Sequence, residues 1–265
     1  MSDPTAGTVS VNGQSCRIWS KGTGRRVGVL PGIGGLPQWS PFLDELSQSC
    51  TVVALSPPGF QGSGVGHEQL DSDLDWALAL YDLMVGAGLE DCDLIGVSVG
   101  GAFAALLAAT WPRLVRRLVL VAPLGLFDEE DPSADIFAVR PGTMPDLLCA
   151  NGSAYRALHD VPEGATDDQT IEWQIKELRA LEAMHRYMWP LGDANLAKRL
   201  PRISVPTLLV RGDQDAVLPE SYVGRFAQTI AGPVESTTIA GAGHLADIDA
   251  PENLATRIRE FLEAG

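Results

Sequence analysis

One stretch of the sequence decides the fold, Asp93-Leu94-Ile95-Gly96-Val97-Ser98-Val99-Gly100-Gly101-Ala102. Its first half is an apolar run typical of a buried strand, and the alanine-rich residues from Val99 to Thr110 predict a helix. The pattern Gly-x-Ser-x-Gly lies at the junction of the two elements. A sharp turn there forces the serine into a strained backbone conformation with its hydroxyl exposed, and the small residues on either side relieve the crowding. Ser98 is therefore a candidate nucleophile.

The same alternation of strand and helix extends along most of the chain. Six short apolar runs lack polar alternation, which is typical of strands buried on both faces of a parallel sheet. They are Arg26–Leu30, Thr51–Leu55, Asp93–Val97, Arg117–Val121, Thr207–Val210 and Ser236–Ile239. A hairpin precedes them, with Thr8–Val11 and Cys16–Trp19 joined by Asn12-Gly13, a dipeptide that accepts positive φ. Strands that alternate with helices predict an α/β fold.

The helices between these strands have recognisable beginnings. Ser40 is an N-cap followed by a proline, and further helices are expected to begin near Ser72, at Val99 and at Pro251. The residues expected on buried helix faces are Leu74, Leu78 and Val85 in the helix from Ser72, and Leu254, Ile258 and Leu262 in the last helix.

The alternation breaks between about Leu124 and Pro201, where no strand is convincing. Thr166 and Gln169 form a capping box that begins a helix over Asp167–Tyr187. The apolar stripe expected to be its buried face is Ile171, Ile175, Leu178, Leu181, Met184 and Met188. We therefore expect a helical cap over residues 125–200, inserted in a core made of residues 1–124 and 201–265.

A candidate acid and a candidate base follow later strands. The run from Thr207 leads into a loop with two carboxylates, Asp213 and Asp215, and His244 follows the final strand in Gly241-Ala242-Gly243-His244. Each candidate lies at the carboxyl end of a predicted strand, where open α/β sheets bind ligands. The chain order is Ser, Asp, His, which is the order of one particular hydrolase architecture.

With these residues the chain resembles an α/β-hydrolase over nearly its whole length. The motifs that carry the resemblance are Leu30-Pro31-Gly32-Ile33-Gly34-Gly35, Pro57-Pro58-Gly59-Phe60-Gln61-Gly62-Ser63, Gly96-Val97-Ser98-Val99-Gly100-Gly101, Gly212-Asp213-Gln214-Asp215 and Gly241-Ala242-Gly243-His244. The resemblance implies an α/β-hydrolase fold, with an eight-stranded, mostly parallel sheet, helices on both faces and a helical cap inserted after the sixth strand. It also implies a triad of Ser98, His244 and an acid, which the family's Gly-x-x-Asp spacing places at Asp215 rather than Asp213.

The sequence departs from the family's pattern at two positions. Many members have His-Gly where this chain has Pro31-Gly32, so the expected oxyanion donors are the N–H groups of Val99 and of Ile33 or Gly34. Ser56 replaces a usual aspartate, and we expect its role to be structural.

The chemistry expected of this arrangement is acyl transfer. A serine hydroxyl is a weak nucleophile at neutral pH, so His244 must take its proton while Asp215 orients the imidazole. We therefore expect a serine hydrolase that cleaves a carboxylic ester or related acyl substrate of small size. A C–C bond hydrolase of ring-fission products, a lactonase and a non-catalytic ligand-binding protein remain alternatives. Candidate substrate-binding residues are Trp39, Met184, Tyr187, Met188 and Trp189, which would equally well pack a small core of their own.

Composition and charge restrict the partners. The 265 residues carry a net charge of −15, and such an acidic surface repels phosphate groups, so we expect neither nucleic acid nor a membrane as partner. The N-terminal residues lack the basic and apolar regions of a signal peptide, and no apolar stretch approaches the ~20 residues of a membrane span.

Cysteine and histidine usage adds three expectations. Cys16, Cys50, Cys92 and Cys149 are scattered, which favours buried reduced thiols and a cytoplasmic protein. No metal-binding spacing occurs, so neither a metal nor another cofactor is expected. The remaining histidines, His67, His159 and His185, are expected to be surface or packing residues. A homodimer is left open.

Overall fold

The computed structural model describes residues 3–189 and 194–264, which form an eight-stranded sheet with helices around it. The strands are β1 (Thr5–Val11), β2 (Gln14–Lys21), β3 (Arg26–Leu30), β4 (Thr51–Leu55), β5 (Cys92–Val97), β6 (Val115–Val121), β7 (Thr207–Gly212) and β8 (Val234–Ile239). Their order in the sheet is β1-β2-β4-β3-β5-β6-β7-β8. Only the pairs β1–β2 and β2–β4 are antiparallel, and the other five are parallel. The expected α/β-hydrolase fold is confirmed.

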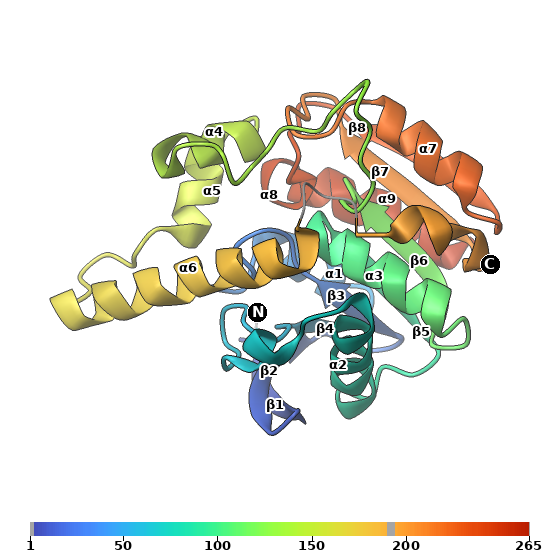
Figure 1. The fold of residues 1–265 in the computed structure, drawn as a ribbon. Helices are drawn as coiled ribbons and strands as arrows, with labels where there is room; N and C mark the ends of the chain where they lie inside the picture. Colours follow the sequence, from blue (N-terminus) through green and yellow to red (C-terminus); the bar gives the residue numbers. More distant parts are fainter. Residues whose placement is uncertain (1–2, 190–193, 265) are drawn as a thin grey trace.

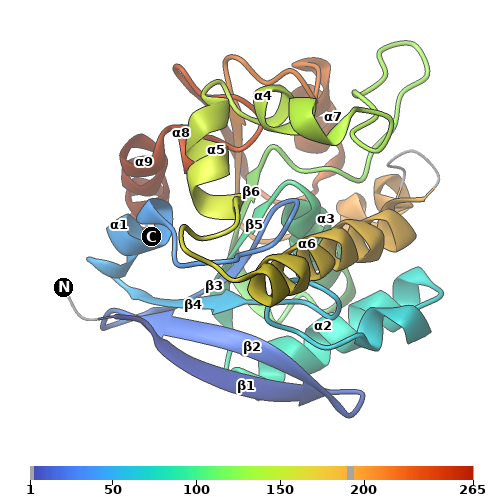
Figure 2. The same cartoon turned by 90° about the vertical axis from the view of Figure 1, so that its left-hand side faces the viewer.

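The helices cover both faces of this sheet (Figures 1 and 2). They are α1 (Pro41–Ser47), α2 (Asp73–Gly86), α3 (Val99–Thr110), α4 (Met144–Leu148), α5 (Gly152–His159), α6 (Asp167–Met188), α7 (Ser221–Thr229), α8 (Ala246–Asp249) and α9 (Pro251–Glu263), with short 3-10 helices at Gly66–Gln69, Pro141–Thr143, Leu196–Lys198 and Leu200–Arg202. Figure 2 shows α1 and α9 on one face and α2 and α3 on the other. No described helix has the length and apolar character needed to cross a membrane.

Local sequence signals fix the ends of several elements. Asn12 and Gly13 both have positive φ, 49° and 76°, and Val11 pairs with Gln14, so the predicted hairpin is confirmed. The hydroxyl of Ser40 accepts a hydrogen bond from the N–H of Leu43 and caps α1 as expected. The capping box that begins α6 is also present.

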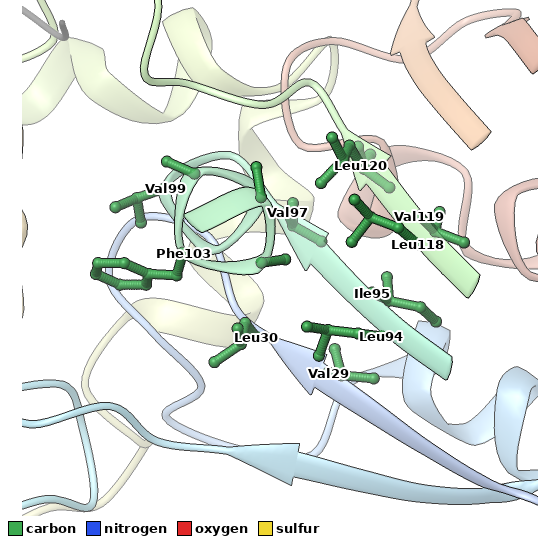
Figure 3. Packing of buried hydrophobic residues seen from close by; sticks show 14 of the residues in the cluster. Val29, Leu30, Leu94, Ile95, Val97, Val99, Phe103, Leu118, Val119 and Leu120 are labelled. Carbon is green, nitrogen blue, oxygen red and sulfur yellow. The ribbon is translucent and has the colours of Figure 1, made fainter. Parts of the chain in front are cut away.

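The core lies on both faces of the central parallel strands, packed against α3 on one face and against α1 and α9 on the other. Figure 3 shows the packing of these strands with α3. Strands β3, β5 and β6 bury apolar side chains on both faces, and small residues let α3 approach the sheet so closely that every residue from Val99 to Ala109 is buried. Strand β8 differs, because it is the last strand of the sheet and Ile239 is its only buried residue. The expectation that Ser236–Ile239 is buried on both faces is therefore wrong.

The predicted buried face of α2 is also wrong. Leu74 and Leu78 point to solvent, and the helix buries Trp76, Leu80 and Leu83 instead. The indole of Trp76 stacks on the ring of Phe103 in α3, with centroids 5.3 Å apart. Burial of this large aromatic surface decides which face of the helix turns inward. In α9, by contrast, the predicted residues Leu254, Ile258 and Leu262 are buried.

The helices α4, α5 and α6 belong to an insertion between β6 and β7, called the insertion below. It contacts the loops that follow β3, β4 and β8, because Cβ atoms built on Gly34, Gly59 and Gly243 would lie within 2.8 Å of its atoms. The insertion therefore covers the carboxyl ends of the parallel strands. Residues 190–193, near its end, lie outside the described residues.

Only the C-terminal half of α6 packs against the core. Met184, Tyr187 and Met188 are buried there. The N-terminal half extends beyond the rest of the molecule (Figure 1), and Ile171, Ile175 and Leu178 are 55%, 49% and 66% exposed. The prediction of a continuous buried stripe is thus wrong for the outer half of the helix, because its contacts with α5 there, from Trp173 and Glu177 to His159, do not cover the apolar stripe.

Candidate active site

Ser98 occupies the predicted strained turn between β5 and α3. Its φ is 53° and its ψ is −116°, a conformation that residues other than glycine rarely adopt. The flanking glycines are required by close backbone contacts. A Cβ on Gly96 would lie 2.2 Å from Gly100 O, and one on Gly100 would lie 2.3 Å from Leu30 O. The strain at Ser98 is held by these contacts and by a 2.8 Å hydrogen bond from its N–H to Val121 O.

His244 joins Ser98 to Asp215 in one chain of hydrogen bonds. His244 Nε2 is 2.8 Å from Ser98 Oγ, and His244 Nδ1 is 3.1 Å from Asp215 Oδ2 and 3.2 Å from Oδ1. An ionised carboxylate only accepts, so Nδ1 carries a proton and Nε2 is free to accept the serine proton. The three residues follow β5, β7 and β8, whose carboxyl ends meet at one edge of the sheet.

Asp215 is held as a carboxylate by several donors. Its Oδ1 accepts hydrogen bonds of 2.9 Å from the N–H groups of Val217 and Leu218. Burial raises the pKa of Asp215, but the charge and hydrogen bond of His244 and the two N–H groups outweigh burial and hold the pKa below its usual value. Asp213 has a different place. It is exposed and accepts a hydrogen bond from the N–H of Gly241, 2.8 Å away.

The loop between β3 and α1, residues 31–40 and called the β3 loop below, passes beside the nucleophile. A Cβ on Gly32 would lie 3.5 Å from Ser98 Cβ. Neither the Ile33 nor the Gly34 N–H has a hydrogen-bond acceptor within the described residues. Val99 is the first residue of α3, where a backbone N–H lacks an intrahelical acceptor. In both predicted pairs of oxyanion donors, Val99 with Ile33 and Val99 with Gly34, the N–H groups are therefore free to bind an oxyanion.

The three residues are closed off from solvent. Ser98 and His244 have 0% exposure, and the side chain of Asp215 has 1%. The β3 loop contacts Ser98 at Gly32, and the insertion contacts the residue before His244 at Ala150. Water is thereby excluded from the hydrogen-bonded chain, which strengthens its electrostatic interactions.

The structure places two of the predicted substrate-binding residues in one apolar pocket. Met184 and Met188 line it together with Leu124, whose N–H donates a 3.1 Å hydrogen bond to Ser98 O. The other lining residues are Phe127, Ser133, Ala134, Asp135, Ile136 and Phe137. Leu124 thus links the pocket to the backbone of Ser98, while Ser98, His244 and Asp215 themselves are not among the lining residues.

The other predicted pocket residues lie elsewhere. Trp39 donates a hydrogen bond to Asp44 and packs edge-on against Trp19. Tyr187 packs against the rings of both Trp76 and Phe103, and Trp189 is exposed at the C-terminal end of α6. Neither Trp39 nor Trp189 is among the residues that line the apolar pocket.

Two carboxylates that follow His244 escaped the sequence reasoning. Asp249 accepts three backbone hydrogen bonds, which are described below. Asp247 lines a small pocket beside the β3 loop, and its Oδ1 is buried with no hydrogen-bond partner among the described residues. Burial raises the pKa of Asp247 to about 6. Their only signal in the sequence is closeness to His244, three and five positions away.

Neither histidines nor cysteines form a further reactive group. Buried His67 lies 3.4 Å from Glu182, His159 stacks on Tyr155, and His185 stacks on Phe137. The four cysteines are free and buried. In residues 3–189 and 194–264 no cluster of three histidine, cysteine or acidic side chains is arranged to hold a metal ion.

The sequence matches the Alpha/beta hydrolase family over residues 29–257, and the chain belongs to this family. The protein is therefore an α/β-hydrolase, and its fold and the arrangement of Ser98, His244 and Asp215 agree with this class.

Individual relatives are distant. Carboxylesterase YbfK of Bacillus subtilis (strain 168) is 23% identical over 240 residues, which cover 88% of this chain and 79% of the relative. The 2-hydroxy-6-oxo-2,4-heptadienoate hydrolase of Pseudomonas putida is 25% identical over 88% of this chain and 86% of the relative. The solved structure of 2-hydroxy-6-oxo-6-phenylhexa-2,4-dienoate hydrolase from Rhodococcus superposes with a TM-score of 0.74 at 18% identity and covers 99% of both chains.

Proposed function

We propose that the protein is a serine hydrolase that cleaves carboxylic esters through an acyl-enzyme on Ser98. The observation that carries this proposal is the unbroken hydrogen-bond chain from Ser98 Oγ through His244 to Asp215. Relatives that include a carboxylesterase support it.

The proposed reaction follows from the positions of these groups. Ser98 Oγ attacks the ester carbonyl carbon while His244 Nε2 takes the serine proton. The N–H groups of Val99 and of Ile33 or Gly34 stabilise the oxyanion, and each such donor contributes about 3 kcal/mol to lowering the barrier. His244 then returns the proton to the leaving alcohol. Water, activated by the same imidazole, hydrolyses the acyl-enzyme and restores Ser98.

The pocket lined by Met184 and Met188 supports an apolar acyl group. Both thioethers are flexible and polarisable, and they adapt to irregular apolar ligands. We therefore propose a small-molecule ester with an apolar acyl part as substrate. Cleavage of a C–C bond in a ring-fission product is the second candidate, because the solved structures similar to this chain include one described as a meta-cleavage product hydrolase. A lactone is a third substrate to include in the assay.

We also propose that residues 125–200 act as a cap over a core of residues 1–124 and 201–265. Complete burial of Ser98 and His244 supports this division, because substrate reaches the serine only after part of the cap moves. The four buried, unpaired thiols support the cytoplasmic location that we propose. Sedimentation analysis tests whether the chain forms the homodimer that the sequence leaves open.

The deciding experiment is intact mass measurement after incubation with a fluorophosphonate, followed by peptide mapping. We expect one adduct, on Ser98, and none on the acid-unfolded protein or on Ser98→Ala. An ester, C–C and lactone panel then identifies the reaction. Ser98→Ala and His244→Ala should each abolish turnover with the fold intact. More than a few per cent of wild-type esterase activity in Ser98→Ala would overturn the assignment.

Absence of an adduct on the wild type is resolved by a much smaller organophosphate. Labelling by the small reagent alone indicates a closed cap and keeps the proposal. Failure of both reagents contradicts an activated serine and favours a ligand-binding protein.

A further inference from the structure

The loop that carries His244 is tied to the insertion on both sides of the histidine. We call residues 240–245 the His244 loop and residues 148–159 the bridge segment. The Leu245 N–H donates a 2.9 Å hydrogen bond to Leu148 O. On the other side of His244, a Cβ on Gly243 would lie 2.7 Å from Ala150 N, so the two backbones are in direct contact.

Asp249 completes this junction. Its Oδ2 accepts hydrogen bonds of 2.8 Å from the N–H groups of both Gly243 and Ala150, and its Oδ1 accepts one of 3.0 Å from the Asn151 N–H. One carboxylate thus joins the residue before His244 to the beginning of α5. Hydrogen bonds to an ionised acceptor are shorter and stronger than neutral ones, which suits a fixed junction.

The other end of the bridge segment is fixed to the β3 loop. Gln38 Nε2 donates hydrogen bonds of 2.9 Å to Ala157 O and Leu158 O at the C-terminal end of α5. A Cβ on Gly34 would lie 2.8 Å from His159 Cε1. Helix α5 therefore connects the His244 loop at one end with the loop of the proposed oxyanion donors at the other.

We propose that Asp249 is a positioning residue for His244, which it holds in register with the β3 loop through the bridge segment. This inference rests on the proposed function. It also implies that α4 and α5 stay with the core during catalysis, so cap movement falls to α6. A displacement of about 1 Å in a reacting group typically costs about 100-fold in rate. Loss of the junction is therefore expected to lower kcat and to leave KM nearly unchanged.

The test compares Asp249→Asn with Asp75→Asn, measured at 25 °C and well below the melting temperature of each. Asp75 also accepts a backbone hydrogen bond, from Ser72 in the α2 capping box, but lies outside the site. We expect Asp249→Asn to lower kcat on a p-nitrophenyl ester, and the rate of fluorophosphonate labelling, by about 10- to 100-fold. KM should change less than about threefold, and Asp75→Asn should match the wild type.

Measuring the same substitution in a His244→Ala background distinguishes positioning of His244 from a merely structural role of Asp249. His244→Ala keeps only the small residual rate, far below about one per cent of wild type, that substrate binding and the oxyanion donors still support. The group to be positioned is gone there, so adding Asp249→Asn should slow this residual reaction by less than about twofold. An equal fall in both backgrounds, or wild-type kcat in folded Asp249→Asn, overturns the inference. Missing Ser98 labelling in the wild type would instead overturn the proposed function.

Gln38→Ala tests the inference even where Asp249→Asn fails to fold. It removes both hydrogen bonds at the far end of α5. We expect kcat to fall about three- to tenfold, with little change in melting temperature, because these bonds lie at the surface. Unchanged kcat in Gln38→Ala contradicts a mechanical link between the two loops.

Discussion

His244 Nε2 lies 2.8 Å from Ser98 Oγ, although 146 residues separate the two in the sequence. The distance is short because β5 and β8 are parallel members of one sheet and both residues follow the carboxyl end of their strand. Asp215 joins them from the end of β7, between the other two in strand order. The order of strands in the sheet therefore assembles the site.

Asp215→Asn and Asp213→Asn should differ widely in activity. Asp215 contacts His244, and an amide in its place no longer holds the imidazole in the required tautomer, so kcat should fall about 10⁴-fold. Asp213 accepts one backbone hydrogen bond from Gly241, and its replacement should cost less than about tenfold. Ester turnover of the two purified variants decides this, and the reverse order of effects would move the acid by two residues.

Gly100→Ala should destabilise the protein by forcing α3 and the end of β3 apart next to Ser98. Its Cβ would lie 2.3 Å from Leu30 O and 2.5 Å from Pro31 O, and backbone atoms at the end of β3 cannot yield without moving the β3 loop. We expect the free energy of unfolding to fall by about 3 kcal/mol or more. Gly142→Ala is the matched control, because nothing lies within 4 Å of the added Cβ. Equal denaturation midpoints for the two variants would contradict the prediction.

Asp247→Asn should change how stability depends on pH. The pKa of Asp247 is raised to about 6 in the folded protein, above an unfolded value near 4, so its favourable contribution is complete below about pH 4 and is lost as pH rises through 6. Asparagine cannot ionise. The free energy of unfolding of the variant relative to wild type should therefore rise by about 2–3 kcal/mol between pH 4 and pH 7.5.

Urea denaturation of both proteins across this pH range provides the measurement for Asp247. A constant difference between variant and wild type would show that burial does not control this carboxyl.

Two substitutions in α6 should separate its exposed half from its buried half. Ile175→Gln replaces a half-exposed side chain and should change the free energy of unfolding by less than about 0.5 kcal/mol. Met184→Ala empties a fully buried position and should cost about 2–5 kcal/mol. Chemical denaturation compares them directly. A large loss in Ile175→Gln would mean that the outer stripe is covered in solution.

Elements with local signals were predictable from the sequence. The hairpin at Asn12-Gly13, the N-cap Ser40 and the capping box of Thr166 each stand where the sequence indicates, since each depends on a few adjacent residues. Ser98, Asp215 and His244 were predictable as candidates for a related reason, because each follows a strand with a recognisable turn sequence. Their proximity also required the order of strands, which came from the resemblance.

The features that the sequence did not predict depend on contacts with residues distant in the sequence. The inward face of α2 is set by Trp76 against Phe103, and the exposure of α6 depends on where the core ends. Asp249 has no sequence signal of its own, because it acts on backbone N–H groups that any residue supplies. For the same reason the packing of Trp39 on Trp19 and the exposure of Trp189 were not predictable from their sequence neighbours.

The contact of Gly100 with Leu30 O and Pro31 O is made by backbone atoms on the β3 side. A contact of this kind requires only that position 100 be glycine, and it places no demand on the side chains of Leu30 and Pro31. Evolutionary divergence can therefore proceed far while the nucleophile and the neighbouring loop keep their spacing.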